Sequence, residues 1–142
     1  MTTMVIDTNV VVAGLLTHHE DSAVARVLDG MLDAAFAYEI PMDLLAEYRE
    51  VLLRPDLRKL HRLSTEDIDV LLAALVEHAA VLSPARANPP DADHAHPWQW
   101  LATRDDLRLV TGDRRLLGAR LAAHALGPED FVAGAAGWSP AG

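Results

Sequence analysis

The fold is decided by the stretch Met4-Val5-Ile6-Asp7-Thr8-Asn9, a short apolar run closed by three polar residues. An apolar run of this length that leads into turn-forming residues is typical of a buried strand. A second stretch of the same kind, Leu107-Arg108-Leu109-Val110-Thr111-Gly112-Asp113, lies near the other end of the chain. We therefore expect strands at residues 4–6 and 107–111, each followed by an aspartate.

Helical patterns separate these two strands. Ser22 predicts the cap of a helix that runs to about residue 33, and a strand is expected at 35–40. Pro41 suits the first turn of a helix that Pro55 ends, and Ser64-Thr65-Glu66-Asp67 has the pattern of a cap before a long helix. Further helices are expected at 10–16, at 97–103, at 114–124 and from 128. Alternating strands and helices predict an α/β fold with a mostly parallel sheet.

Composition narrows the class of protein. The 142 residues suit one domain, expected over 1–142 with its core from about 4 to 133. The absence of cysteine excludes disulfides, thiolate zinc sites and a cysteine nucleophile. The first basic residue is Arg26, and no apolar run approaches the roughly 20 residues that span a bilayer, so we expect a cytoplasmic protein without a signal peptide.

Acidic residues carry the chemistry that the sequence predicts. A formal charge of −9 opposes passive binding to phosphate and suits carboxylates gathered around a cation. Asp7 and Asp113 follow strands, and the carboxyl ends of parallel strands meet at one edge of a sheet. Either residue alone would be a helix cap or a turn, whereas two at equivalent strand ends indicate a site. Glu47 is a third candidate, and the loop Asp91-Ala92-Asp93-His94-Ala95-His96 supplies a fourth group.

These motifs, in this order, resemble those of the PIN-domain nucleases, most closely the VapC-like toxin branch of toxin–antitoxin systems. The resemblance runs from Met4 to about Phe131 and is carried by Val5-Ile6-Asp7-Thr8-Asn9-Val10, Leu44-Leu45-Ala46-Glu47-Tyr48, Val51-Leu52 with Arg54-Pro55, and Val110-Thr111-Gly112-Asp113-Arg114 with Leu116-Leu117. It implies a three-layer α/β/α fold around a mostly parallel sheet. It also implies a Mg²⁺- or Mn²⁺-dependent endoribonuclease that hydrolyses RNA, is paired with a small antitoxin protein and forms a homodimer.

The resemblance also assigns roles to single residues. Asp7, Glu47 and Asp113 fall on the first, second and fourth acidic positions of the family. The supporting polar positions, which orient carboxylates or water, are occupied by Thr8, Asn9 and Thr111.

The third acidic position departs from the family pattern. Related sequences have Asp-x-x-Asp-x-His-x-Trp; Asp91, His96 and Trp98 match it, and His94 stands where the second aspartate is expected. The third metal ligand is then Asp93, with a one-residue shift, or Asp91 or His94. Otherwise the site is weakened. The resulting catalytic set is Asp7, Glu47, Asp93 and Asp113, and the metal ligands are the same four with Asp91 added.

Two alternatives concern the surface. Arg54, Arg58, Lys59 and Arg62 lie within nine residues and predict either a basic rim for weak RNA binding or an ordinary solubilising surface. The rival to an enzyme is a catalytically weak or inactive PIN scaffold that binds a protein partner. Metal-dependent RNA cleavage separates the two classes.

Overall fold

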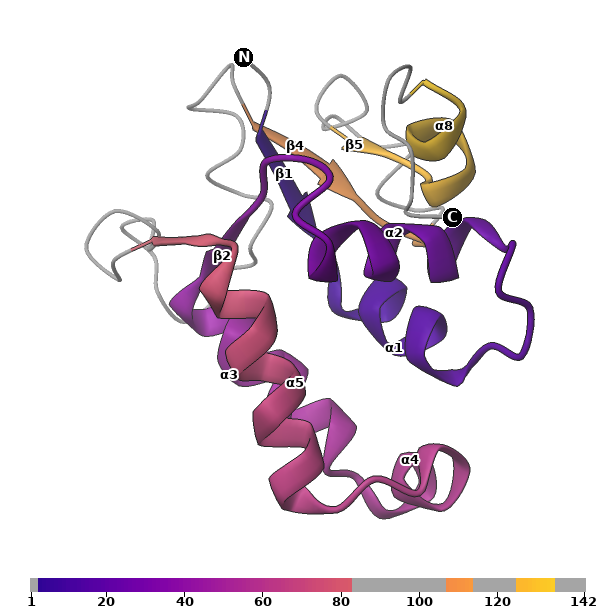
Figure 1. The fold of residues 1–142 in the computed structure, drawn as a ribbon, viewed down its shortest axis with the longest axis vertical. Coiled ribbons are helices and arrows are strands. Elements are labelled where there is room, and N and C mark those ends of the chain that lie inside the picture. The colour runs from indigo at the N-terminus through magenta and orange to yellow at the C-terminus, as the bar shows by residue number, and fades with distance from the viewer. Residues whose placement is uncertain (1–2, 83–106, 114–124, 135–142) are drawn as a thin grey trace.

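The computed structural model describes residues 3–82, 107–113 and 125–134 (Figure 1). The expected helices at 97–103 and 114–124 lie outside these ranges. In chain order the described elements are β1 (Thr3–Ile6), α1 (Thr8–Leu16), α2 (Ala23–Leu32), β2 (Glu39–Pro41), α3 (Met42–Leu52), α4 (Pro55–His61), α5 (Thr65–Glu77), β3 (Ala80–Leu82), β4 (Leu107–Val110), β5 (Ala125–Leu126) and α8 (Pro128–Ala133).

All the strand pairs of the described residues are parallel. β1 pairs with β4, β4 with β5, and β2 with β3. An isolated bridge from Met4 to Tyr38, just before β2, joins the two sheets in the order β3-β2-β1-β4-β5. The strands that follow β1 in the chain, β2 and β3, lie on one side of it, and the later strands β4 and β5 lie on the other. This reversal of strand order makes the β1–β4 boundary a topological switch point. The predicted α/β fold with a parallel sheet is confirmed.

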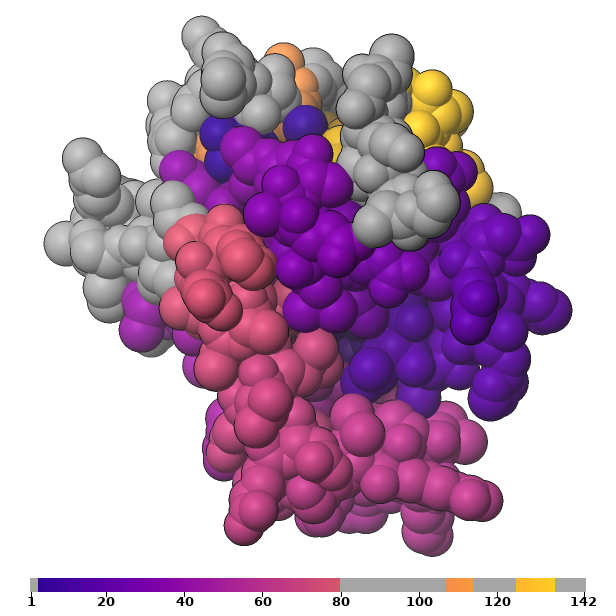
Figure 2. All heavy atoms as spheres, in the orientation of Figure 1, coloured from indigo at the N-terminus to yellow at the C-terminus, as the bar shows by residue number. Residues whose placement is uncertain are grey.

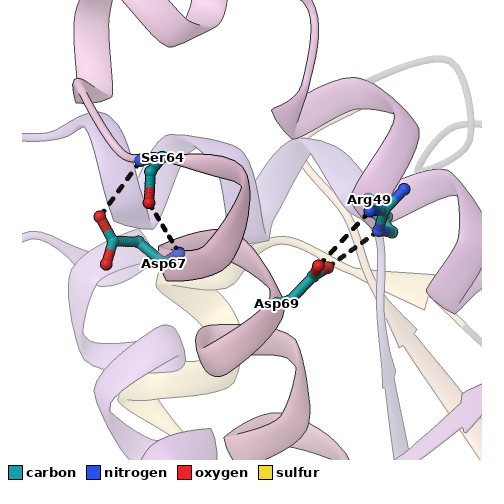
Figure 3. A network of polar contacts seen from close by, with 4 residues as sticks. All are labelled: Arg49, Ser64, Asp67 and Asp69. Atoms are coloured by element: carbon teal, nitrogen blue, oxygen red, sulfur yellow. Dashed lines mark hydrogen bonds and ion pairs between the residues drawn. The ribbon is translucent and has the colours of Figure 1, made fainter.

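Local signals set the helix starts. The Ser22 hydroxyl accepts a hydrogen bond from the Ala25 N–H at 3.3 Å, as the sequence predicts for a cap. Ser64 and Asp67 form a reciprocal capping box, drawn in Figure 3, with bonds of 3.0 and 3.1 Å. These side chains satisfy N–H groups that have no partner within the helix, so each fixes a helix start from a few residues alone.

Several expectations about element bounds were wrong. α1 begins at Thr8 rather than at residue 10, because the Asp7 carboxylate accepts the Thr8 N–H and caps the helix at once. The strand expected at 35–40 is β2, Glu39–Pro41, because Ala34 adopts a left-handed conformation (φ 54°) and residues 35–37 are irregular. Pro55 ends α3 as expected but also opens α4, where its missing N–H costs nothing. β3 and β5 were not predicted.

The core is continuous across the sheet. Val5 and Ile6 of β1 and Leu109 and Val110 of β4 are all buried, as expected for strands covered on both faces. The hydroxyl of buried Tyr38 donates to the Leu75 carbonyl at 2.6 Å, which ties α5 to the strand region.

α4 stands apart from this core. None of its residues is buried, and it lies at the end of the molecule away from β4 (Figures 1 and 2). His61 attaches it: the ring contacts the Leu52 carbonyl at 2.8 Å and accepts the Leu63 N–H at 2.9 Å. Since Nδ1 is the acceptor, Nε2 donates to Leu52.

Gly14→Ala tests the close packing of α1 on α2. A Cβ at Gly14 would lie 2.6 Å from the Val24 carbonyl oxygen and 3.0 Å from the Leu28 Cβ, so the two helices must move apart. We expect a loss of about 1–3 kcal/mol in unfolding free energy, measured by denaturant titration. Gly134→Ala is the control, because its Cβ would lie in ordinary contact with the Asp130 carbonyl oxygen at 3.4 Å, and its change should stay within about 0.5 kcal/mol. Equal stability of the two variants would show that α1 and α2 tolerate the extra atom.

Candidate functional site

Three carboxylates that are far apart in the sequence line one cavity at the switch point of the sheet. The cavity has a volume of about 630 Å³, and its walls include Asp7 after β1, Glu47 of α3 and Asp113 after β4. Thr8 and Asn9 complete this polar end. The structure thus brings together the two acids at the strand ends and the third candidate, Glu47, in the walls of one cavity.

Asp7 is held by donors from two elements. Its Oδ1 accepts the Thr8 N–H at 2.8 Å, and its Oδ2 accepts the Thr111 hydroxyl at 2.8 Å and the Asn9 amide at 3.3 Å. The Asp7 N–H itself donates to the Val110 carbonyl at 2.9 Å and so continues the β1–β4 pairing. Asp7 is therefore a helix cap and a cavity residue at once, two interpretations that the sequence sets against each other.

Asn9 and Thr111 join the loops after β1 and β4. The Asn9 side-chain oxygen accepts the Gly112 N–H at 2.9 Å, and the buried Thr111 hydroxyl accepts the Asp113 N–H at 3.0 Å. A Cβ at Gly112 would lie only 3.3 Å from Asn9 Oδ1, so glycine permits this approach. The contacts explain how Asp113 is fixed next to Asp7. The catalytic support assigned to these residues stays a prediction.

Two consecutive residues of α3 form hydrogen bonds to the residues immediately before and after Asp7. The Thr8 hydroxyl donates a short hydrogen bond to Glu47 Oε2, and the Tyr48 hydroxyl donates another to the Ile6 carbonyl. Tyr48 is fully buried. The position of Glu47 relative to Asp7 is therefore set by contacts to the residues immediately before and after Asp7.

Tyr48 is a residue of the site to which the sequence analysis assigned no role, although it belongs to the Leu44–Tyr48 motif. The signal lies in Pro41. Continuing the parallel register from the Met4–Tyr38 bridge, the N–H that would reach the Ile6 carbonyl belongs to residue 41, and proline has none. The Tyr48 hydroxyl supplies the missing donor to a buried acceptor.

The surroundings of Tyr48 keep its phenol protonated, so that its hydroxyl can donate a hydrogen bond. Burial raises the pKa of Tyr48 well above its usual value, and the negative charges of Asp7 and Glu47 raise this pKa further. Burial also raises the pKa of Tyr38 to about 12. Both phenols therefore remain protonated wherever the fold is intact at ordinary pH.

Of the other predicted residues, only some fall within the described part of the chain. Asp91, Asp93 and His94 lie outside the described residues. Arg54 lines the cavity, whereas the remaining members of the predicted basic rim are exposed on and beside α4: Arg58, Lys59 and Arg62. Within 3–82, 107–113 and 125–134, no helix is long and apolar enough to cross a membrane.

The donor set fits a hard divalent cation. Over the described ranges no three His, Asp or Glu side chains already stand at metal-binding distance from one another. Mg²⁺, however, commonly binds through one or two carboxylates and keeps several waters. A carboxylate offers about four acceptor sites, and Asp7 uses three of them while Glu47 uses one on Thr8. Asp7 and Glu47 thus retain oxygen lone pairs for an ion in the shared cavity.

Alkaline titration tests the two buried tyrosines, which are the only ones in the sequence. Their pKa values are raised in the fold relative to about 10 in an unfolded chain, so their contribution to stability is complete below pH 10. It is lost as the pH rises from 10 towards 12 and above. We expect phenolate absorbance to appear only together with unfolding, followed by circular dichroism. A tyrosine that ionises near pH 10 in the still folded protein would contradict this.

Comparison with known proteins agrees with this geometry. The PIN domain family model matches residues 3–115, more than half of the chain, and the matched range includes Asp7, Glu47 and Asp113. No curated protein and no solved structure matches the sequence. The chain belongs to the PIN domain family.

Proposed function

We propose that this PIN domain, a single domain spanning 1–142, is a Mg²⁺- or Mn²⁺-dependent endoribonuclease. PIN domains are generally nucleases, which gives the reaction class. The observation that carries the proposal is the meeting of Asp7, Glu47 and Asp113 in one cavity at the switch point of the sheet. Asp93, with Asp91 as the alternative, is proposed to add the fourth carboxylate.

The residues of the cavity suit phosphodiester hydrolysis. In this reaction a water oxygen bonds to phosphorus, the bond from phosphorus to the leaving ribose oxygen breaks, and that oxygen takes up a proton. A bound divalent ion would lower the pKa of its water and offset charge on the phosphate. Donors from Thr8, Asn9 and Thr111 would hold Asp7 in one orientation, while the Thr8 hydroxyl would do the same for Glu47.

The biological setting is proposed from the similarity of the motifs to the VapC-like branch. On that basis the protein is a cytoplasmic toxin that forms a homodimer and is inhibited by a small antitoxin. Its charge of −9 predicts weak and salt-sensitive RNA binding, mainly through the basic residues of the α4 region: Arg54, Arg58, Lys59 and Arg62.

A protein-binding scaffold without activity is the second candidate. It is favoured by His94, which stands at an expected acidic position, and by the lack of three metal-ready side chains in the described ranges. Cleavage of a panel of RNAs with and without Mg²⁺ and Mn²⁺ decides between the candidates.

Metal addition should stabilise the fold. An ion that binds only the folded carboxylates raises the unfolding free energy by about 1.4 kcal/mol at ten times its dissociation constant. The measurement is a melting curve with Mg²⁺, with Mn²⁺ and with a chelator. Asp7→Asn is the matched control and should lose most of the shift. Identical curves in all conditions would count against a metal site.

Variants of the acids should separate catalysis from folding. Asp7→Asn and Asp113→Asn are expected to abolish metal-dependent cleavage. Asn at position 7 can keep the cap bond from the Thr8 N–H but cannot accept from both Thr111 and Asn9 on its amide nitrogen. Each change also removes one charge from a group of like charges, so both variants should stay folded without metal, with a loss of no more than about 1–2 kcal/mol for Asp7→Asn. Unfolding of both variants would show that the acids are structural.

The third acid requires its own comparison. Asp91→Asn, Asp93→Asn and His94→Ala should be assayed side by side in Mg²⁺ and Mn²⁺. We expect the loss of cleavage to be confined to Asp93→Asn. A loss confined to Asp91→Asn, or a Mn²⁺-selective loss in His94→Ala, moves the ligand to that residue.

A further inference from the structure

The cavity extends well beyond its acidic end. Along α1 its walls continue from Thr8 through Val12 to Leu16, and along α3 from Glu47 to Val51, with Arg54 two residues beyond the end of that helix. The spacings of four residues keep each helical series on one face. At 1.5 Å per residue the α1 wall is roughly 12 Å long. The cavity is therefore a groove between α1 and α3 with acids at one end and an arginine at the other.

The middle of the groove is apolar and accessible. Val12, Ala13, Leu16 and Val51 form this apolar wall, and all four are half-buried. Val12 also packs against the hydrophobic core, but the proposed metal chemistry uses none of the four side chains. A ligand that lies on them gains the free energy of removing apolar area from water.

Arg54 closes the far end of the groove. It is the one cation among the described residues that line the cavity, and it is exposed. Arg49, five residues earlier in the same chain, is instead paired with Asp69 at 2.9 Å (Figure 3). Within the described ranges Arg54 makes no such ion pair, so its guanidinium can take an anion from solution.

The groove offers, in order, carboxylates that could hold a metal ion, an apolar wall and a cation, and this order suits the phosphate, the base and the next phosphate of a nucleic acid strand. We propose that the α1–α3 groove is a subsite for the nucleotide next to the cleaved bond, with its base on the apolar wall and its outer phosphate on Arg54. The inference rests on the proposed ribonuclease function and deepens it. A base whose face lies on Val51 cannot stay stacked between two neighbours, so this nucleotide must leave an RNA helix for cleavage.

The test uses the full chain and one single-stranded RNA oligonucleotide that it cleaves. The nucleoside on each side of the cut is replaced in turn by an abasic one, and the next phosphate outward by an uncharged methylphosphonate. We expect the abasic change at one of the two sides to lower kcat/KM by about tenfold. A fully paired duplex of the same sequence should be cleaved much more slowly.

Matched variants locate these effects in the groove. Val51→Asn should remove the sensitivity to the abasic change, whereas Val70→Asn, at a valine of α5 that is 70% exposed, should keep it. Arg54→Ala should remove the sensitivity to the methylphosphonate and reduce the salt dependence of binding by about 0.7 in the logarithmic slope. Arg49→Ala should leave both unchanged. Melting curves confirm that each variant is folded.

Each outcome decides the proposal. Cleavage that shows the same abasic and methylphosphonate sensitivities in the parent, Val51→Asn and Arg54→Ala would overturn the subsite and leave the ribonuclease function standing. Absence of RNA cleavage by the parent in either metal would overturn both. If Val51→Asn keeps the RNA effects but loses binding of a small protein encoded beside the gene, the groove belongs to that partner and not to RNA.

Discussion

The Asp7 carboxylate is the point on which the rest of the site depends. It receives hydrogen bonds from the first N–H of α1 and from the Thr111 hydroxyl beyond β4, at 2.8 Å each. One side chain thus caps a helix, joins two strand ends and faces the cavity. Because these bonds all reach Asp7 from neighbouring elements, the acidic end of the cavity is built by the same interactions that complete the fold.

A second constraint comes from proline. Pro41 ends β2 and starts α3, and it leaves the Ile6 carbonyl without a backbone donor from that side. Tyr48, which lies on the helix that Pro41 opens, returns to this carbonyl, and Glu47 beside it meets Thr8. The Tyr48 hydroxyl therefore replaces the N–H that Pro41 lacks. Since Glu47 is the neighbour of Tyr48, the same contact helps to set the position of the Glu47 carboxylate.

The sequence was informative where a few neighbouring residues decide the structure. The strand before Asp7, the Ser22 cap and the Ser64–Asp67 box could all be predicted in this way. The pairing of Asp7 with Asp113 followed instead from the expected parallel sheet, and the role of Glu47 from the family resemblance. Tyr48 could not, because its role depends on a strand register that forms between distant segments. β3 and β5 were missed because two or three residues are too few to display an alternating pattern, and α4 because a proline was interpreted only as an end.

α4 has a consequence for how such a protein changes during evolution. This helix carries Arg58 and Lys59, is flanked by Arg54 and Arg62, buries none of its own residues and is attached through His61 to the end of α3. Substitutions of Arg58 and Lys59 therefore cost the fold little. The sequence of α4 can therefore change during evolution while the packing around the carboxylates is kept, so related chains should diverge faster along this helix than along the buried strands β1 and β4.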